Sequence, residues 1–351
     1  MIEIDGSVGE GGGQIVRTAI ALAAITGQEV EIRNIRANRP NPGLAAQHLH
    51  AVKAVERLSR GKTEGLQLHS QRLKFSPGDL KCIHTELDIG TAGSITLLLQ
   101  CLIPVALFAD CESVVTVKGG TDVRWAPPID FYTGVFLKAL RVMGCDIWID
   151  MKRRGYYPRG GGVVEVRISP LAGGLKGFKP EYVQREQGEG AESRIVKGIS
   201  HSRGLPTHVT ERQARAAEQI LHDCGYSTAI EREVDDKTAT AVRATTGSGI
   251  TLWLGYKSGS ALGKPGKRAE LVGEEAAHEI LRELNSSSSV DIHLADQLIP
   301  YIALADGGSE LRVREMTEHL RTNIYVTKRF LDIEFEVMRI SGDDVVEIRR
   351  E

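Results

Sequence analysis

The sequence predicts a mixed α/β (α+β) protein, built from a repeated unit with a smaller α/β domain inserted into it. A helix, a strand, a second helix and a hairpin of strands recur in that order three times. The stretch from 185 to 285 does not follow this order. An apolar share of 41% in 351 residues is enough for one large core or two smaller ones. We therefore expect a large domain formed by residues 1–184 and 286–351, and an inserted domain formed by residues 185–285.

The elements of the three copies can be placed from their periodicity. The first copy follows a short strand, IEID, and its expected helices and strands are 13–25, 29–35, 44–59, 65–70 and 72–77. In the second copy we expect a helix within 91–111, a strand at 113–120, a helix at 129–143, and strands at 146–152 and 162–169. In the third copy we expect a helix within 293–308, a strand at 310–315, a helix at 319–330, and strands at 332–340 and 344–350.

The inserted domain is expected to open with a polar, glycine-rich approach at 184–193. Its amphipathic helices should cover 210–224 and 274–284, with Gly225 ending the first of them. Strands are expected at 194–200, 228–233 and 249–256, and the serine run 286–289 is interpreted as the return linker.

Composition limits the classes of function. The 44 basic and 46 acidic residues nearly cancel, so any anion site must be local, and no general attraction to nucleic acid or to a membrane is expected. The apolar run 95–109 predicts a buried helix, and the absence of a signal-peptide pattern predicts a cytoplasmic protein. Odd in number and without CxxC spacing, the cysteines are interpreted as buried thiols of a reducing compartment, with neither a disulfide framework nor a zinc site. They are Cys82, Cys101, Cys111, Cys145 and Cys224.

A glycine cluster, GEGGGQ, stands at residues 9–14 between a strand and a helix. It matches neither of the common glycine-rich phosphate motifs, and the turn interpretation is favoured when it is taken alone. Polar side chains around it favour an anion site instead. Glu10 can bind a hard cation, while Gln14 and Arg17 lie one turn apart on the same side of the following helix.

Two further loops carry polar or rigid residues. The segment 34–54 offers Arg36, Arg39, Gln47 and His48 as phosphate ligands, with a solvated loop as the equally weighted alternative. In the segment 118–131, the pair of prolines that starts with Pro127 follows Trp125. This pair can form a flat wall for a base, or simply start a helix. The segment 155–162 is interpreted as a hairpin turn.

The third copy contains the most distinctive residues. HLADQLIP places His293, Asp296 and Gln297 within about one helical turn, and His319 stands where another helix begins. A histidine at a helix start is more often structural than catalytic. Near a nucleotide, however, a neutral imidazole can attack the α-phosphate to give a covalent phosphoramidate.

Seven blocks in fixed order, over essentially the whole chain, resemble the RNA 3′-terminal phosphate cyclases. They are DGSVGEGGGQIVRTA, RPNPGLAAQHL, TAGSITLLLQ, GGTDVRWAPP, YYPRGGG, HLADQL and HLRTN. The resemblance implies three βαβαββ modules and a smaller inserted domain. It also implies a reaction: ATP adenylylates a histidine with release of pyrophosphate, and AMP then passes to an RNA 3′-phosphate to give RNA(3′)pp(5′)A. Attack by the vicinal 2′-OH finally yields a 2′,3′-cyclic end and AMP.

Roles for individual residues follow from the same resemblance. His319 matches the adenylylated histidine, and Glu10 matches the carboxylate that binds Mg²⁺ or Mn²⁺. The positions similar to the ATP site are Gln100, Pro127, His293, Leu294, Ala295, Asp296 and Gln297. Those similar to the RNA-phosphate and triphosphate pocket are Arg17, Arg36, Arg39, Gln47 and His48. Two positions depart from the family pattern: His293 replaces an aromatic residue, and Glu318 replaces a small one.

Two other functions stay open at this point. A non-catalytic relative serving ribosome assembly should lack the nucleophile, which is present as His319. An enolpyruvyl transferase would need a basic pocket and would form no adenylate. The basic run 264–268 can touch RNA or be a solvated loop, the second being favoured. The sequence makes no prediction of oligomeric state.

Overall fold

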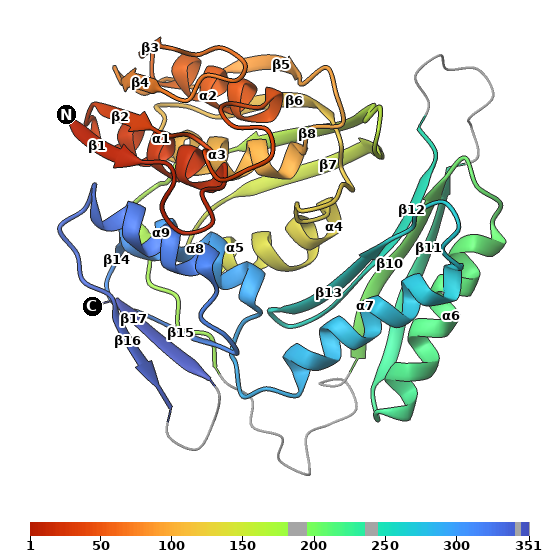
Figure 1. Ribbon diagram of the computed structural model, residues 1–351. Helices are drawn as coiled ribbons and strands as arrows, with labels where there is room; N and C mark the ends of the chain where they lie inside the picture. Colours follow the sequence, from red (N-terminus) through yellow and green to blue (C-terminus); the bar gives the residue numbers. More distant parts are fainter. Residues whose placement is uncertain (182–194, 236–244, 341–344, 351) are drawn as a thin grey trace.

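The computed structural model describes residues 1–181, 195–235, 245–340 and 345–350, and it is a mixed α/β structure (Figure 1). The fold class predicted from the sequence is confirmed. The expected approach at 184–193 lies outside the described residues. Among the described residues, no helix is both long and apolar enough to cross a membrane.

The first two sheets share one strand arrangement. One has the order β1-β2-β4-β3 and the other the order β5-β6-β8-β7; in each, the first pair is parallel and the remaining pairs are antiparallel. The strands of the first are Ile2–Asp5, Val30–Arg33, Lys62–Glu64 (β3) and Leu73–Ser76 (β4). Those of the second are β5 to β8 in chain order: His84–Asp88, Ser113–Gly119, Ile147–Arg153 and Gly162–Ile168.

A third sheet, β15-β17-β16, repeats the antiparallel part of this order. Its strands are Ser309–Val313 (β15), Glu336–Arg339 (β16) and Val346–Arg350 (β17). Just before β15, the short strand β14 (Ala305–Asp306) pairs in parallel with β9 (Leu175–Lys176). The segment that precedes the insertion thus lies where β1 and β5 lie in the other two sheets. The similarity of the three sheets favours the predicted repeat, which stays an interpretation.

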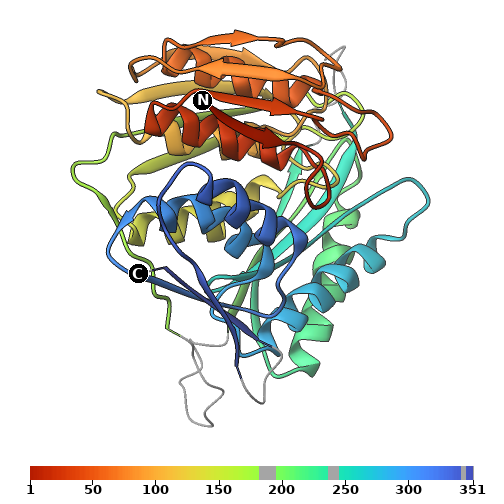
Figure 2. The same ribbon diagram turned by 60° about the vertical axis from the view of Figure 1, so that its left-hand side comes forward.

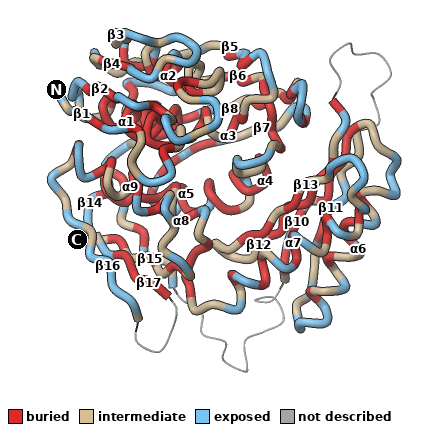
Figure 3. Tube along the Cα trace, in the orientation of Figure 1, coloured by how far each residue is buried: buried red, intermediate tan, exposed pale blue. Residues whose placement is uncertain are grey.

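Helices from different copies pack against one another in the middle of the molecule (Figures 1 and 2). Helix α1 contacts α2, α3 and α9, and α8 contacts α3 and α9. Their bounds are Gln14–Thr26 (α1), Ala46–Leu58 (α2), Ile95–Ala106 (α3), Ile292–Leu304 (α8) and Glu318–Lys328 (α9). Figure 3 shows α1 buried over most of its length. The reason is that one core cluster joins all three sheets and these helices. Polar residues on such a helix therefore need partners.

The chain between 195 and 284 has its own sheet, of order β11-β10-β12-β13, and its own core cluster. Two helices cover it, α6 (His208–Asp223) and α7 (Ala269–Leu284). The strands β10 to β13 are Ile195–Arg203, Ser227–Asp235, Gly247–Leu254 and Lys257–Leu262. Gly225 has a positive φ of 82° after α6, as a helix-ending glycine should. The domain boundaries at 184 and 286 stay a prediction.

Several element predictions were wrong or incomplete. Residues 65–70 form turns, and the strand lies earlier, at Lys62–Glu64. The helix expected at 129–143 is divided into Ile129–Phe131 (α4), a π-helical segment Tyr132–Phe136, and Leu137–Val142 (α5). A Cβ on Gly134 in the π-helical segment would lie 2.8 Å from the indole of Trp253 on β12. The glycine therefore leaves room for Trp253 of the inserted part to pack here. Strands β5, β9, β13 and β14 were not predicted.

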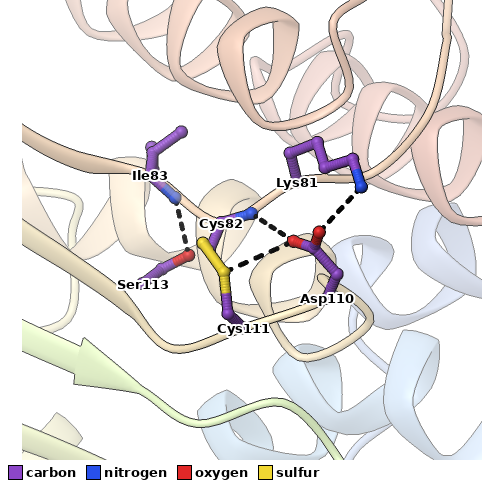
Figure 4. The surroundings of a disulfide bond; sticks show 6 residues. All are labelled: Lys81, Cys82, Ile83, Asp110, Cys111 and Ser113. Atoms are coloured by element: carbon purple, nitrogen blue, oxygen red, sulfur yellow. Dashed lines mark hydrogen bonds and ion pairs between the residues drawn. A yellow bond between two sulfur atoms is a disulfide. The ribbon is translucent and has the colours of Figure 1, made fainter.

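The cysteine prediction was wrong for three residues. Cys82 and Cys111 form a disulfide, with Cα atoms 5.2 Å apart and a sequence separation of 29 positions (Figure 4). The segments before β5 and β6 run side by side, where Asp110 accepts hydrogen bonds from the Cys82 amide and Lys81. This proximity depends on the parallel pairing of two strands separated by a helix, which cysteine spacing does not encode. Cys101 and Cys145 are buried free thiols as expected, whereas Cys224 is exposed.

Candidate active site

The imidazole of His319 is held at the start of α9, where Thr317 caps the helix by accepting a hydrogen bond from the Leu320 amide at 3.1 Å. The ring nitrogen Nδ1 contacts Oε1 of Gln14. The Gln14 Nε2 donates to the His319 carbonyl and to the Asp296 carboxylate, at 2.9 and 2.8 Å, which fixes Oε1 as the acceptor. Because Nδ1 must then carry the proton, Nε2 holds the lone pair, and the side chain is 44% exposed.

A buried network supports this contact from α8, α9 and α1. Asn323, one turn after His319, donates to the backbone and side-chain oxygens of Asp296, each at 2.7 Å. Thr18, one turn after Gln14, donates to the Asn323 side-chain oxygen at 2.7 Å. Three helices are thus locked together beneath the imidazole, so its orientation is set by the fold itself.

The charged form of the Asp296 carboxyl group is destabilised by burial in this network. Burial raises the pKa of Asp296 to about 6, and nearby His319, His293 and Arg17 oppose the rise. Its side chain accepts from both Gln14 and Asn323. A carboxylate destabilised in this way and held by oriented donors is typical of functional sites.

Glu10 lies on the glycine loop in front of the imidazole. Its Oε2 is 3.4 Å from Nε2 of His319 and accepts a 2.7 Å hydrogen bond from Arg39. The loop approaches α9 closely, since a Cβ on Gly9, whose φ is +61°, would lie 2.6 Å from Oγ1 of Thr322. The glycines therefore allow a carboxylate to reach the exposed nitrogen.

A second group of polar residues surrounds the start of α1. Arg17 is buried and its Nε donates to Oε1 of Gln100 on α3 at 2.9 Å. His48 accepts from the Ala45 amide through Nδ1, so Nε2 carries the proton, and a Cβ on Gly13 would lie 1.9 Å from that nitrogen. Burial, together with the charges of Arg17 and Arg36, holds the pKa of His48 well below its usual value. A neutral donor and a buried cation thus converge on a positive helix end, a combination that suits an anion.

The remaining predicted phosphate ligands lie around this group. Arg36 donates to the Gly43 carbonyl at 2.8 Å, and burial together with the charge of Arg39 lowers its pKa. Gln47 accepts from the Ser94 amide at 3.1 Å through its side-chain oxygen. The structure therefore brings together residues from four of the sequence motifs: the glycine cluster, the arginine loop, and the starts of α8 and α9.

The predicted ATP positions are less closely grouped. Pro127 lies near the start of α3, where its carbonyl accepts from Thr96 at 2.7 Å. His293 is paired with Glu279 of α7 at 3.6 Å. Burial alone would lower the pKa of His293, but Glu279 and Asp291 outweigh this effect and raise the pKa to about 9. Leu294 and Ala295 face the main core, and the side-chain oxygen of buried Gln297 has no hydrogen-bond partner among the described residues. No described contact joins Pro127 or His293 to His319.

The sequence prediction did not include two members of the network, Asn323 and Thr18. The available signal was spacing, because Asn323 follows His319 by four residues and Thr18 follows Gln14 by four. Gln14 was noticed as a polar residue, but its contact with His319 across 305 residues could not be read from the sequence.

Fold and site together define a class: α/β proteins in which a histidine with a free Nε2 faces a carboxylate and a basic, anion-binding helix end. The RNA 3′-terminal phosphate cyclase family model matches residues 8–337. The chain therefore belongs to the RNA 3′-terminal phosphate cyclase family, and it is an enzyme.

Individual relatives agree with this assignment over nearly the full length. The RNA 3′-terminal phosphate cyclase of Archaeoglobus fulgidus is 47% identical over 346 residues, covering 99% of each chain. That of Methanosarcina acetivorans is 49% identical and covers 97% of this chain and 98% of its own. That of Pyrococcus furiosus is 45% identical, covering 96% and 95%.

Proposed function

We propose that the protein uses ATP to convert an RNA 3′-terminal phosphate into a 2′,3′-cyclic phosphodiester, with His319 as the residue that carries AMP. The observation that carries the proposal is the geometry of His319: Nδ1 is held by Gln14, while Nε2 lies on a half-exposed side chain and faces the Glu10 carboxylate at 3.4 Å. Family membership and the named relatives support the overall reaction.

In the first step, the Nε2 lone pair attacks the α-phosphorus of ATP. A phosphorus–nitrogen bond forms, the bond to the β-phosphate oxygen breaks, and pyrophosphate leaves with that electron pair. The Nδ1 proton stays on the ring, and its hydrogen bond to Gln14 stabilises the positive charge that develops on the imidazole. The basic helix end with Arg17 is placed to stabilise the phosphate oxygens.

In the second step, an oxygen of the RNA 3′-phosphate attacks the same phosphorus and releases neutral His319, giving RNA(3′)pp(5′)A. The vicinal 2′-OH then attacks the RNA phosphate, loses its proton, and expels AMP as the cyclic end forms. Arg36, Arg39, Gln47 and His48 are proposed to hold the RNA phosphate, in keeping with the donors that surround the start of α1.

The nucleotide is proposed to lie between the starts of α3 and α8. Asp296 orients it, and Gln297 offers a buried side-chain oxygen that has no hydrogen-bond partner within the described part of the chain. Gln100 contacts the triphosphate through its link to Arg17. Pro127 and the exposed His293 flank the base, with the backbone of Leu294 and Ala295 completing this wall.

Glu10 would hold a divalent metal, Mg²⁺ or Mn²⁺. The donor set fits, because Mg²⁺ in nucleotide sites takes one or two carboxylates together with substrate phosphates, and Glu10 is one exposed carboxylate beside His319. When bound, the metal neutralises phosphate charge. Glu10 also pairs with Arg39 and so positions that guanidinium.

The proposal is tested by incubating the protein with α-labelled ATP and Mg²⁺. Acid-labile, alkali-stable label should appear on the wild type and be lost in His319→Ala, whereas His222→Ala, which changes an exposed histidine of α6, should keep it. Addition of a 3′-phosphorylated oligonucleotide should then discharge the label and make the RNA end resistant to phosphatase. Absence of label on the wild type would exclude this mechanism and leave the enolpyruvyl-transferase and non-catalytic functions as the rivals.

A further inference from the structure

Trp125 stands out among the side chains that the proposed reaction does not use. It is 94% exposed, and its φ of 59° places a bulky residue in the left-handed region. Such a conformation costs free energy, and it persists where the surrounding loop determines it. The loop between β6 and α4 therefore holds an indole ring out in solvent without any gain in core packing.

This loop forms one wall of a cleft of about 430 Å³. The opposite wall comes from the inserted part, through Thr251 of β12, Ser260 of β13 and Lys264 in the loop that follows. The short helix α4, which follows this loop, contacts β12 of the inserted part, and Figure 1 shows the two parts facing each other there. The cleft thus exists only because the two parts of the chain are joined side by side.

The charge of the cleft is positive. The side chains of Arg124 and Lys264 line it and make no hydrogen bond or ion pair with any other described residue, whereas Lys267 is neutralised by Glu275. Unpaired cations next to an exposed aromatic ring are the chemistry of single-stranded nucleic-acid binding, in which bases stack on the ring and the cations contact phosphates.

The cleft is connected to the proposed phosphate site by a continuous line of contacts. The Gln47 side chain accepts from the Ser94 amide, and the Ser94 hydroxyl lies 2.8 Å from that of Thr96. Thr96 in turn donates to the carbonyl of Pro127, two residues after Trp125. These contacts hold the loop that carries Trp125 against the start of α3, next to Gln47.

We propose that the cleft binds single-stranded RNA immediately upstream of the 3′-terminal phosphate, with a base stacked on Trp125 and backbone phosphates facing Arg124 and Lys264. This inference rests on the proposed function, because RNA is taken as the substrate. Stacking on an aromatic ring tolerates any base, so the cleft contributes affinity without sequence preference.

The first test measures the affinity of the full-length protein for a ten-nucleotide RNA with a 3′-phosphate. Trp125→Ala should weaken binding about tenfold, while the matched variant Trp148→Ala, which removes another exposed tryptophan on β7, should not. The rate of protein labelling by α-labelled ATP should stay unchanged in Trp125→Ala. Equal weakening by both variants, or parallel loss of labelling, would overturn the inference; the second result would assign the cleft to ATP.

The second test measures the dependence of that affinity on salt. Arg124→Ala combined with Lys264→Ala should reduce the slope of log K against log salt by about 1.4, because two phosphate contacts are lost. A control with Lys53→Ala and Lys62→Ala, two exposed lysines elsewhere, should leave the slope unchanged. An unchanged slope in the cleft variant would overturn the inference. If the wild type formed no adenylate but the cleft variants still weakened RNA binding, the proposed function would fail and the cleft would stand.

Discussion

Two polar clusters, each containing a histidine, lie in different surroundings in this protein. In the cluster around His319 the imidazole is half exposed, and its Nε2 faces the equally exposed Glu10 at 3.4 Å. The cluster around Arg154 is buried, and its guanidinium is 2% exposed. Arg154 donates to Asp122, Asp130 and Glu233, and so joins the loop after β6, helix α4 and strand β11 of the inserted part.

The difference shows how similar residue types serve two purposes. Around Arg154, three carboxylates share one guanidinium, and burial lowers the pKa of His201 to about 3, so its imidazole is neutral. Around His319, the exposed Glu10 carboxylate faces Nε2 at 3.4 Å and pairs with Arg39. The first cluster holds two parts of the chain together, whereas the second is open to a ligand.

The largest expected effect breaks the buried cluster. Arg154→Ala should lower the free energy of unfolding by about 3 to 5 kcal/mol, because it leaves the buried Asp122 and Asp130 carboxylates without their cation. Urea denaturation followed by circular dichroism measures this. Arg212→Ala, which removes an exposed pair with Glu270, is the control and should leave the midpoint nearly unchanged. A small effect of Arg154→Ala would show that the cluster does not hold the parts together.

Asp296→Asn should instead increase the free energy of unfolding at neutral pH. Because the folded pKa is raised to about 6 from an ordinary value of 3.8, ionisation is disfavoured by folding, and the destabilisation builds up as pH rises from about 4 to 6. The asparagine variant should recover up to about 3 kcal/mol at pH 7 and nothing below pH 4. Denaturation at pH 4, 5, 6 and 7 measures this difference.

The same variant should label more slowly with ATP, as is common where stability and function compete. An equal stability difference at all four pH values would contradict the raised pKa. Asp306→Asn, at an exposed site on β14, serves as the control for the charge change.

Gln14→Met tests whether the fold orients His319. It removes the acceptor for Nδ1 at nearly constant volume, so the labelling rate should fall about 10- to 100-fold. Gln14→Glu keeps an acceptor and should label faster than Gln14→Met, even though it places a second carboxyl near Asp296. Equal rates for both variants would indicate that Gln14 has only a packing role.

Tyr156→Phe is the mildest change. It removes the 2.7 Å hydrogen bond between the Tyr156 hydroxyl and Nδ1 of His201, which should cost about 1 kcal/mol of stability without changing the labelling rate. Urea denaturation together with the labelling assay measures both. A loss of labelling in this variant would show that the two clusters are coupled.

The sequence predicted these two clusters to different extents. His319, Glu10, Arg17 and Asp296 were identified because polar residues at a helix start or in a glycine loop have a recognisable spacing, and the resemblance to a family placed them in order. Arg154 and its partners were not, because Asp122, Asp130 and Glu233 follow no motif and meet only when the inserted part packs against the rest. The same holds for Cys82 and Cys111.

The helices and most strands could be predicted from apolar periodicity, since each buries one face. The π-helical segment could not, because it depends on the fit between Gly134 and Trp253, which are distant in sequence.

The central claim is that the AMP-carrying atom is Nε2 of His319, with Nδ1 held by Gln14. It is tested most directly by isolating the adenylylated protein and identifying the modified nitrogen by peptide mass spectrometry and phosphorus NMR. The account predicts one AMP on Nε2 of His319. An adenylyl group on Nδ1, or on any other residue, would contradict it.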